Sequence, residues 1–347
     1  MKNKIAIASA FIAASSFSTA EIVINDFLSF EGFVDMSYTH TDSEDFDGAE
    51  SNENSYQVDQ VEISWLFNFD TVTAQVDIDA EGSNGSNGDD VFDDSDSGSG
   101  LSELEIEQAF VNYALGNGDV ITAGRYASML GFEAFEPTGL YQYSTAYVFF
   151  DNIEIGTPGY AQGVKYTSEG DNTFFGISLQ DSVSGDYADN LGGPDGGWGV
   201  EVAGAYYMDN GLSFFLGGAF EDDNETGDAY VINSYVTFET GAWIFAAELN
   251  YGEEDPDGAA KTDGVSGLLM ANFAYSDVAS VTGRVSFYDQ DNAGTDEDGY
   301  ALTLAHGYAF TDNLLLVTEV SYGEEDRDGA VQESEVLFGA VELLFTF

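Results

Sequence analysis

Carboxylates outnumber every other side chain in this sequence that could do chemistry. The 347 residues include 64 Asp and Glu, 7 Lys and Arg, two His and no Cys. The lack of Cys excludes a disulfide framework, a thiolate metal site and a cysteine nucleophile. His40 and His306 are too few to build a nucleophile and base around. We therefore expect no enzyme active site.

Two acidic segments have nearly the same sequence, which raises the question of cation binding. Residues 251–259 read YGEEDPDGA and residues 322–330 read YGEEDRDGA. Carboxylates close to Gly can hold a divalent cation through oxygen ligands, but this spacing is not that of an EF-hand. We expect solvated loops with at most weak Ca²⁺ or Mg²⁺ association, no defined metal site and no cofactor.

The charge balance excludes one class of partner. The formal net charge is −57, and residues 21–347, which hold five bases and all 64 acids, carry −59. A chain of this charge is repelled by phosphate backbones, so nucleic acid is excluded. Because 44% of the residues are hydrophobic, the geometry of the fold must separate the charges from the apolar side chains.

The first twenty residues have the pattern of an export signal. Lys2 and Lys4 precede an apolar run over 5–14, and the small residues 18–20 suit a cleavage site. A membrane anchor is the alternative reading, but the run is too short to span a bilayer. No later stretch reaches about 18 apolar residues. The expected division is a signal peptide over 1–20 and a single domain over 21–347, which could enter a membrane only as a closed barrel.

The remaining sequence alternates with a period of two residues. In 72–80 the even positions are apolar and the odd positions polar, and in 60–69 Gln60, Glu62, Ser64 and Asn68 alternate with apolar residues. This pattern indicates strands. Segments of about ten such residues with aromatics near their ends are typical of a lipid-facing band with two girdles. A soluble β-sandwich would show the same alternation, so the lengths of the connections must distinguish a barrel from a sandwich.

The connections alternate between short and long. Gly, Asn and Asp mark short ones, as at 116–118 and 209–211, whereas long acidic ones lie at 41–55, 82–102, 183–197, 253–263 and 324–333. This asymmetry is typical of a barrel inserted from the periplasm. We predict an all-β fold, a transmembrane antiparallel β-barrel of about 16 strands with short periplasmic turns and long outer loops. The expected strands are 28–40, 56–69, 71–81, 103–115, 119–127, 159–168, 172–182, 198–208, 211–221, 229–239, 242–252, 264–275, 278–289, 298–310, 312–323 and 334–347.

The same alternation places many acids on the inward face. A wet lumen tolerates these charges, and their negative potential predicts a preference for cations. Hydration of the surface, as in proteins from salty water, is an alternative reading of the acidity. The inward acids include the expected lumen-lining residues Glu62, Asp77, Asp79 and Glu248, together with Glu31, Asp35, Glu105, Glu107, Glu201, Glu319 and Glu342.

Two segments carry a resemblance to a known family. After the strand ending near Gly124-Arg125-Tyr126, residues 130–144 read LGFEAFEPTGLYQYS, and the last strand, 339–347, ends with Phe345 and Phe347. Together they resemble the OmpL-like branch of Gram-negative porins, which share the architecture of general trimeric porins. The resemblance implies a location in the outer membrane, homotrimers, contact with lipid and lipopolysaccharide, and passive diffusion of small hydrophilic solutes. It also implies that the barrel-assembly machinery recognises Phe345 and Phe347.

The resemblance further implies a pore constriction. In general porins the third outer loop folds into the lumen and sets acids against bases on the opposite wall. The matching segment here carries Glu133 and Glu136, followed by Asp151 and Glu154. The expected basic partners are Lys165 and Arg284, which face inward by alternation, and Arg125, which lies next to the loop. A substrate-specific channel for a sugar or another small nutrient is the alternative function. Tyr141, Tyr143 and Tyr147 could stack on a sugar, although such aromatics more often pack the loop against the wall.

Overall fold

The structure, a computed structural model, is one sheet that closes on itself. It describes residues 21–81, 104–150, 157–183, 197–223, 227–256, 258 and 260–347. The expected signal peptide lies outside the described residues, as do Asp151 and Glu154. Among the described residues, no helix is both long and apolar enough to cross a bilayer.

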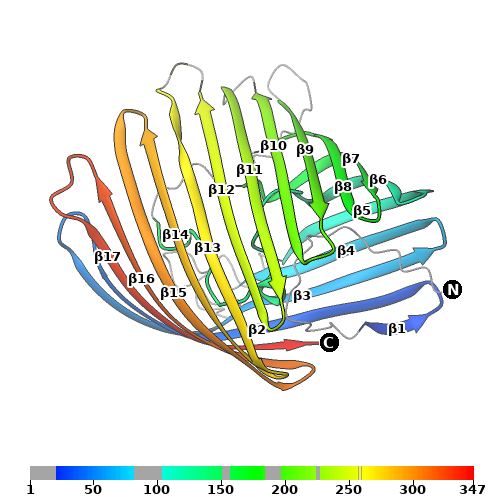
Figure 1. Cartoon of the computed structure of the whole chain (residues 1–347), viewed down its shortest axis with the longest axis horizontal. Coiled ribbons are helices and arrows are strands. Elements are labelled where there is room, and N and C mark those ends of the chain that lie inside the picture. The colour runs from blue at the N-terminus through cyan, green and yellow to red at the C-terminus, as the bar shows by residue number, and fades with distance from the viewer. Residues whose placement is uncertain are drawn as a thin grey trace.

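Antiparallel strands follow one another around the wall, each paired with its neighbours in sequence (Figure 1). The alternating segments form strands because the bonded backbone leaves successive side chains on opposite faces. The strands are β1 (Ile22–Asn25), β2 (Leu28–Glu44), β3 (Glu50–Phe69), β4 (Val72–Glu81), β5 (Leu104–Gly116), β6 (Asp119–Ala127), β7 (Tyr160–Glu169), β8 (Thr173–Gln180), β9 (Trp198–Tyr207), β10 (Leu212–Asp223), β11 (Gly227–Thr240), β12 (Trp243–Asp255), β13 (Thr262–Ser276), β14 (Ala279–Asn292), β15 (Thr295–Thr311), β16 (Leu314–Arg327) and β17 (Ser334–Thr346).

The last strand closes the ring. β17 pairs with β2 from Glu335 opposite Glu44 to Thr346 opposite Phe33. Gly32 and Phe347 then exchange two backbone hydrogen bonds of 2.9 Å. The four-residue β1 pairs with the start of β2, so the wall consists of the sixteen strands β2 to β17. The predicted all-β antiparallel barrel and its strand number are confirmed.

Short turns join the strands at one end of the barrel. They occupy 70–71, 117–118, 170–172, 208–211, 241–242, 277–278 and 312–313. In the turn after β5, Asn117 has φ 58° and Gly118 has φ 87°. Positive φ at both central residues is the geometry that a two-residue hairpin requires, and Asn-Gly adopts it readily.

At the other end the strands run further than the alternation predicted. β2 continues to Glu44 and β3 begins at Glu50, so most of the expected loop 41–55 is a paired hairpin. β16 likewise extends to Arg327, and only two residues join β14 to β15. Strands that project beyond the membrane are wet on both faces, so they lose the apolar stripe while the backbone ladder continues. The loops expected at 41–55, 253–263 and 324–333 are therefore shorter than predicted, whereas those expected at 82–102 and 183–197 lie almost wholly outside the described residues.

The two faces of the wall differ as the alternation predicted. On β13, Leu268 and Met270 point inward and are buried, whereas Leu269 between them is 61% exposed on the outside. An outward apolar band is what lipid contact requires. The four expected lumen-lining acids, Glu62, Asp77, Asp79 and Glu248, are all buried inside the barrel.

Two bulges add acids to the inward face. Across from β2, the register of β3 steps from Gln60 to Val58 and leaves Asp59 as the extra residue. Across from β4, the register of β5 steps from Gln108 to Ile106 and leaves Glu107 as the extra residue. A bulge re-aims a side chain at the cost of one ladder bond. Consecutive residues therefore face the interior at both places.

Candidate functional site: the segment inside the barrel

The segment between β6 and β7, residues 128–159, contacts side chains that point into the barrel; we call it the inner loop. Its described part, 128–150 and 157–159, includes one short 3₁₀ turn, Pro137–Gly139. Its partners lie on β3, β9, β11, β12, β14 and β16. Contacts with so many strands place the inner loop within the ring.

Wall carboxylates accept hydrogen bonds from the backbone of the inner loop. Glu201 on β9 accepts the N–H of Met129 at 2.6 Å, and Glu248 on β12 accepts that of Phe132 at 2.7 Å. Glu319 on β16 accepts the N–H groups of Tyr143 and Ser144 at 2.9 and 3.0 Å. A loop inside a barrel has unpaired backbone donors, and buried donors need acceptors. These acids supply them.

Arg284 joins the inner loop to β14. Its guanidinium donates to Glu133 at 2.6 Å and to the backbone carbonyls of Ser144 at 2.7 Å and Thr145 at 2.9 Å. The Arg284 side chain is fully buried, and that of Glu133 is 13% exposed. Hydrogen bonds between ionised groups are among the strongest in proteins. Glu133 and Arg284, both expected at the constriction, therefore meet at the junction of loop and wall.

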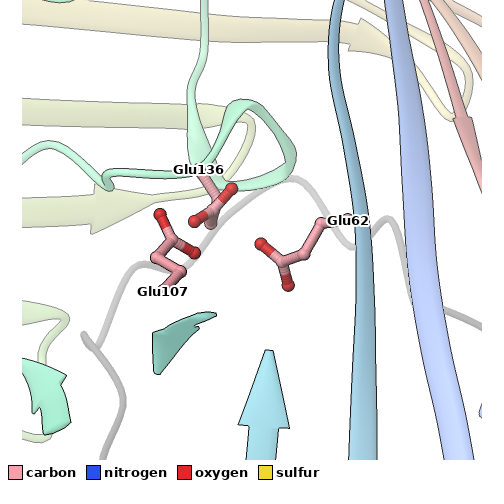
Figure 2. Close-up of side chains that lie close together, drawn as sticks. All are labelled: Glu62, Glu107 and Glu136. Atoms are coloured by element: carbon pink, nitrogen blue, oxygen red, sulfur yellow. The ribbon is translucent and has the colours of Figure 1, made fainter. Parts of the chain in front are cut away.

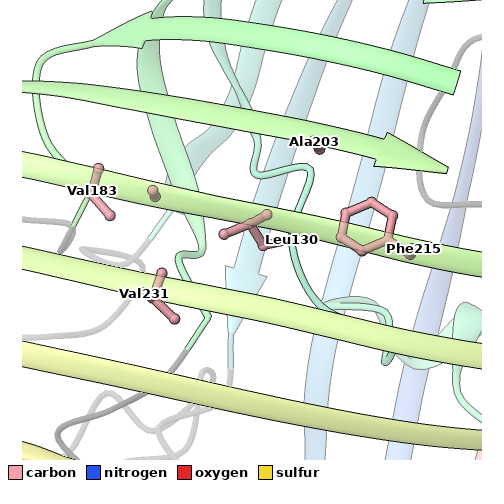
Figure 3. Packing of buried hydrophobic residues seen from close by; sticks show 6 residues of the cluster. Leu130, Val183, Ala203, Phe215 and Val231 are labelled. Carbon is pink, nitrogen blue, oxygen red and sulfur yellow. The ribbon is translucent and has the colours of Figure 1, made fainter.

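An apolar contact fixes the start of the inner loop. Leu130 packs with Ala203, Phe215 and Val231, which project from β9, β10 and β11 (Figure 3). Gly217 on β10 leaves the space that Leu130 occupies, because a Cβ at this position would overlap the Leu130 side chain. Glycine here serves a close approach of the loop to the wall.

We expect Gly217→Ala to destabilise the protein by about 1–3 kcal/mol, because the added methyl overpacks this contact. The measurement is the free energy of unfolding in urea. Gly283→Ala on β14 is the control, since a Cβ there would have no described atom within 4 Å. Equal stability of the two variants would contradict this role of Gly217.

The tyrosines of the inner loop pack against the wall. Tyr141 and Tyr147 lie against the cluster of Phe132, Ala246 and Leu268. Tyr143 stacks on Phe338 of β17 at 5.8 Å between ring centroids, and its hydroxyl lies 3.2 Å from Asp59. The structure thus favours the packing reading of these rings over a stacking track for sugars.

The other two expected bases lie away from Arg284. Lys165 on β7 is buried, its ammonium 4.3 Å from the ring centroid of Tyr126, and it donates to the carbonyl of Ala127 at 3.1 Å. Arg125 alternates on β6 with the buried Tyr126, and its guanidinium lies 5.9 Å from the ring centroid of Tyr160. A role of these bases in a constriction stays a prediction.

Glu136 belongs to a second group, beside β3 and β5 and away from Arg284 on β14. Its carboxylate faces Glu62 of β3 and Glu107 of β5 (Figure 2), and carboxylate oxygens of the three lie within 4.8 Å of one another. Burial, followed by the charges of Glu62 and Glu107, raises the pKa of Glu136 well above the usual carboxyl range. A second such group, Glu324, Glu333 and Glu335, lies near the outer ends of β16 and β17.

Alternation identified the face of these acids but not their partners. Glu201 and Glu319 were expected to face inward, and nothing in their local sequence indicates that they bind loop backbone. Asn233, which accepts the N–H of Gly131 at 3.1 Å, had no signal beyond its place on a strand. The terminal aromatics are placed on β17 and just after it, with Phe345 and Phe347 5.9 Å apart between ring centroids. Their role as an insertion signal stays a prediction.

Comparison with known protein families gives a match over nearly the whole described chain. The family described as "Putative beta-barrel porin-2, OmpL-like" matches residues 28–347. No curated protein matches this sequence.

Solved structures share the fold at low sequence identity. The outer membrane channel DcaP of Acinetobacter baumannii is 12% identical, with a TM-score of 0.66 over 92% of this chain and 97% of that one. The anion-selective porin from Comamonas acidovorans is 15% identical, with a TM-score of 0.67 over 92% and 99%. OmpT of Vibrio cholerae, in a form lacking loop L8, is 12% identical, with a TM-score of 0.65 over 92% and 99%.

Proposed function

This chain belongs to the OmpL-like family of β-barrel porins of the Gram-negative outer membrane, and we propose that it forms a water-filled channel for passive diffusion of small hydrophilic solutes and ions, with a preference for cations. The observation that carries the proposal is a closed barrel whose interior holds a loop tied to its wall by polar contacts. Such a loop narrows a lumen, and both its polar contacts and its apolar clusters hold it against the wall. An enzymatic role has no support in the two His residues of the sequence.

The cation preference rests on the balance of inward charges. The inward-facing bases Lys165 and Arg284 are both buried, and Arg284 is already paired with Glu133. The inward acids outnumber them several times, and charges of one sign in a low-dielectric tube focus their potential along it. The anion-selective porin from Comamonas acidovorans shares this fold, so the fold alone does not set the sign of the preference.

We expect a reversal potential of the cation-selective sign in a KCl gradient across a planar bilayer. The preference should weaken as salt is raised, since the Debye length falls from about 10 Å at 0.1 M to about 3 Å at 1 M. An anion-selective reversal potential would overturn the preference while leaving the channel intact.

Liposome swelling with sugars of graded size tests the passage of solutes. Flux that falls with size and does not saturate supports a general porin. Saturable flux would favour a substrate-specific channel, and no flux would contradict a channel.

We also propose that the chain forms a homotrimer, supported by the trimer form described for OmpT of Vibrio cholerae, and that it contacts lipopolysaccharide. Chemical cross-linking in native membranes would test the trimer.

A further inference from the structure

Three carboxylates from separate parts of the chain meet inside the barrel. Glu62 comes from the middle of β3, Glu107 is the bulge residue of β5, and Glu136 precedes the 3₁₀ turn of the inner loop. Figure 2 shows the three side chains converging on one point, and their closest oxygens lie within 4.8 Å of one another. Neither β3 nor β5 alone brings two of these groups together.

Some oxygens in this group have protein donors, and others have none among the described residues. Glu136 accepts hydrogen bonds from Tyr160 and Gln60, both at 3.0 Å, and Glu62 Oε1 accepts one from Ser64 at 2.7 Å. Glu62 Oε2 and Glu107 Oε2 are buried with no hydrogen-bond partner in the described structure. Glu62 is only 6% exposed. A buried acceptor left in this way costs about 1–3 kcal/mol.

The ion pairs of Lys261, Arg284 and Arg327 with Glu133, Glu253, Asp263 and Glu297 do not involve the three carboxylates. Carboxylates at this separation cannot all stay ionised unless a positive charge lies between them. Either a proton shared between carboxyl groups or a bound cation relieves this repulsion, and a calcium titration distinguishes the two.

We propose that Glu62, Glu107 and Glu136 bind one divalent cation of the calcium type, which ties the inner loop to β3 and β5. Calcium takes oxygen ligands at about 2.3–2.6 Å, so ligands on opposite sides of the ion lie about 4.6–5.2 Å apart. Three carboxylate oxygens that all lie within 4.8 Å of one another can therefore reach one ion of this size.

The cation would complete the attachment of the inner loop. Glu201, Glu248, Glu319 and Arg284 hold the loop on β9, β12, β16 and β14. On the side of β3 and β5, the Glu136 carboxylate accepts a hydrogen bond from Gln60 but faces Glu62 and Glu107, which repel it when all are ionised. A bound cation converts this repulsion into a link between loop and wall.

Calcium titration of the purified full-length chain in detergent, after treatment with EDTA, tests the site. Isothermal titration calorimetry should show one saturable site per chain above any weak background from the outer loops. Glu107→Gln and Glu62→Gln should each weaken that site at least about tenfold, as expected when a ligand charge is lost. Glu335→Gln, in the outer carboxylate group, is the matched control and should leave the site unchanged.

Two results would overturn the proposal. One is the absence of a saturable site in the wild-type chain, which would mean that the carboxylates share protons instead. The other is loss of the site in Glu335→Gln but not in Glu107→Gln, which would place binding outside. Circular dichroism and heat-modified gel mobility check that each variant is folded. Terbium luminescence of the wild-type chain, displaced by Ca²⁺, gives a second readout that needs no variant. Neither measurement depends on conductance, so failure here is distinct from failure of the proposed channel function.

Discussion

Replacing Arg284 with alanine should free the inner loop from β14 and widen the conducting path. The substitution removes the donors to Glu133 and to two backbone carbonyls of the loop. It also leaves the mostly buried carboxylate of Glu133 without its charged partner, with hydrogen bonds only from Gln142 and the Ala146 N–H. Breaking a buried ion pair by removing one member costs about 3–5 kcal/mol.

Single-channel recording and liposome swelling measure the outcome of Arg284→Ala. We expect higher and noisier conductance, together with faster entry of larger sugars. Lys261→Ala is the control, since Lys261 forms ion pairs with Glu253 and Asp263 at the outer end of the barrel and is 40% exposed. Exposed ion pairs of this kind contribute little to stability because solvent screens them. Unchanged conductance in Arg284→Ala would show that the loop does not depend on this anchor.

The second large effect is expected at Glu319, where the hydrogen bond and the charge can be tested separately. Glu319→Ala removes the acceptor of two loop N–H groups and of the Ser144 hydroxyl. Each buried donor left unpaired costs about 1–3 kcal/mol. We expect a loosened loop, increased conductance and a lower free energy of unfolding.

Glu319→Gln should behave differently from Glu319→Ala. The amide oxygen of glutamine can still accept from the loop backbone, whereas the charge is lost in both variants. Conductance should therefore stay near the wild-type level in Glu319→Gln, while the reversal potential shifts by the same small amount in both. If Glu319→Gln opens the channel as far as Glu319→Ala, the charge of Glu319, not its acceptor geometry, holds the loop.

These predictions separate two roles that the inward acids can combine. A carboxylate that accepts backbone N–H groups remains a negative charge near the lumen, so anchoring and ion preference can reside in one side chain. Glu248 illustrates both, since it is buried and binds Phe132 and Asn233. The sequence suggested only a contribution to the ion preference for Glu248.

Local sequence determined the wall of this barrel. The period of two in 72–80 reflects the pleat of a strand between lipid and a polar interior, and that constraint acts residue by residue. It therefore predicted the number of strands and the inward face of Glu62, Asp77, Asp79 and Glu248. The apolar alternation ends where the strands leave the membrane, so the sequence of the paired outer ends of β2 and β3 resembled that of a loop.

Tertiary structure alone decided what the inward residues meet. The partners Arg284 and Glu133 are separated by 151 positions, and no local pattern encodes a contact across a closed ring. The bulge at Glu107 breaks the alternation within one strand, so two neighbouring residues face inward where the pattern allows one. Glu62, Glu107 and Glu136 converge because ring closure, a register step and the path of the inner loop act together, and each of these is a property of the assembled barrel.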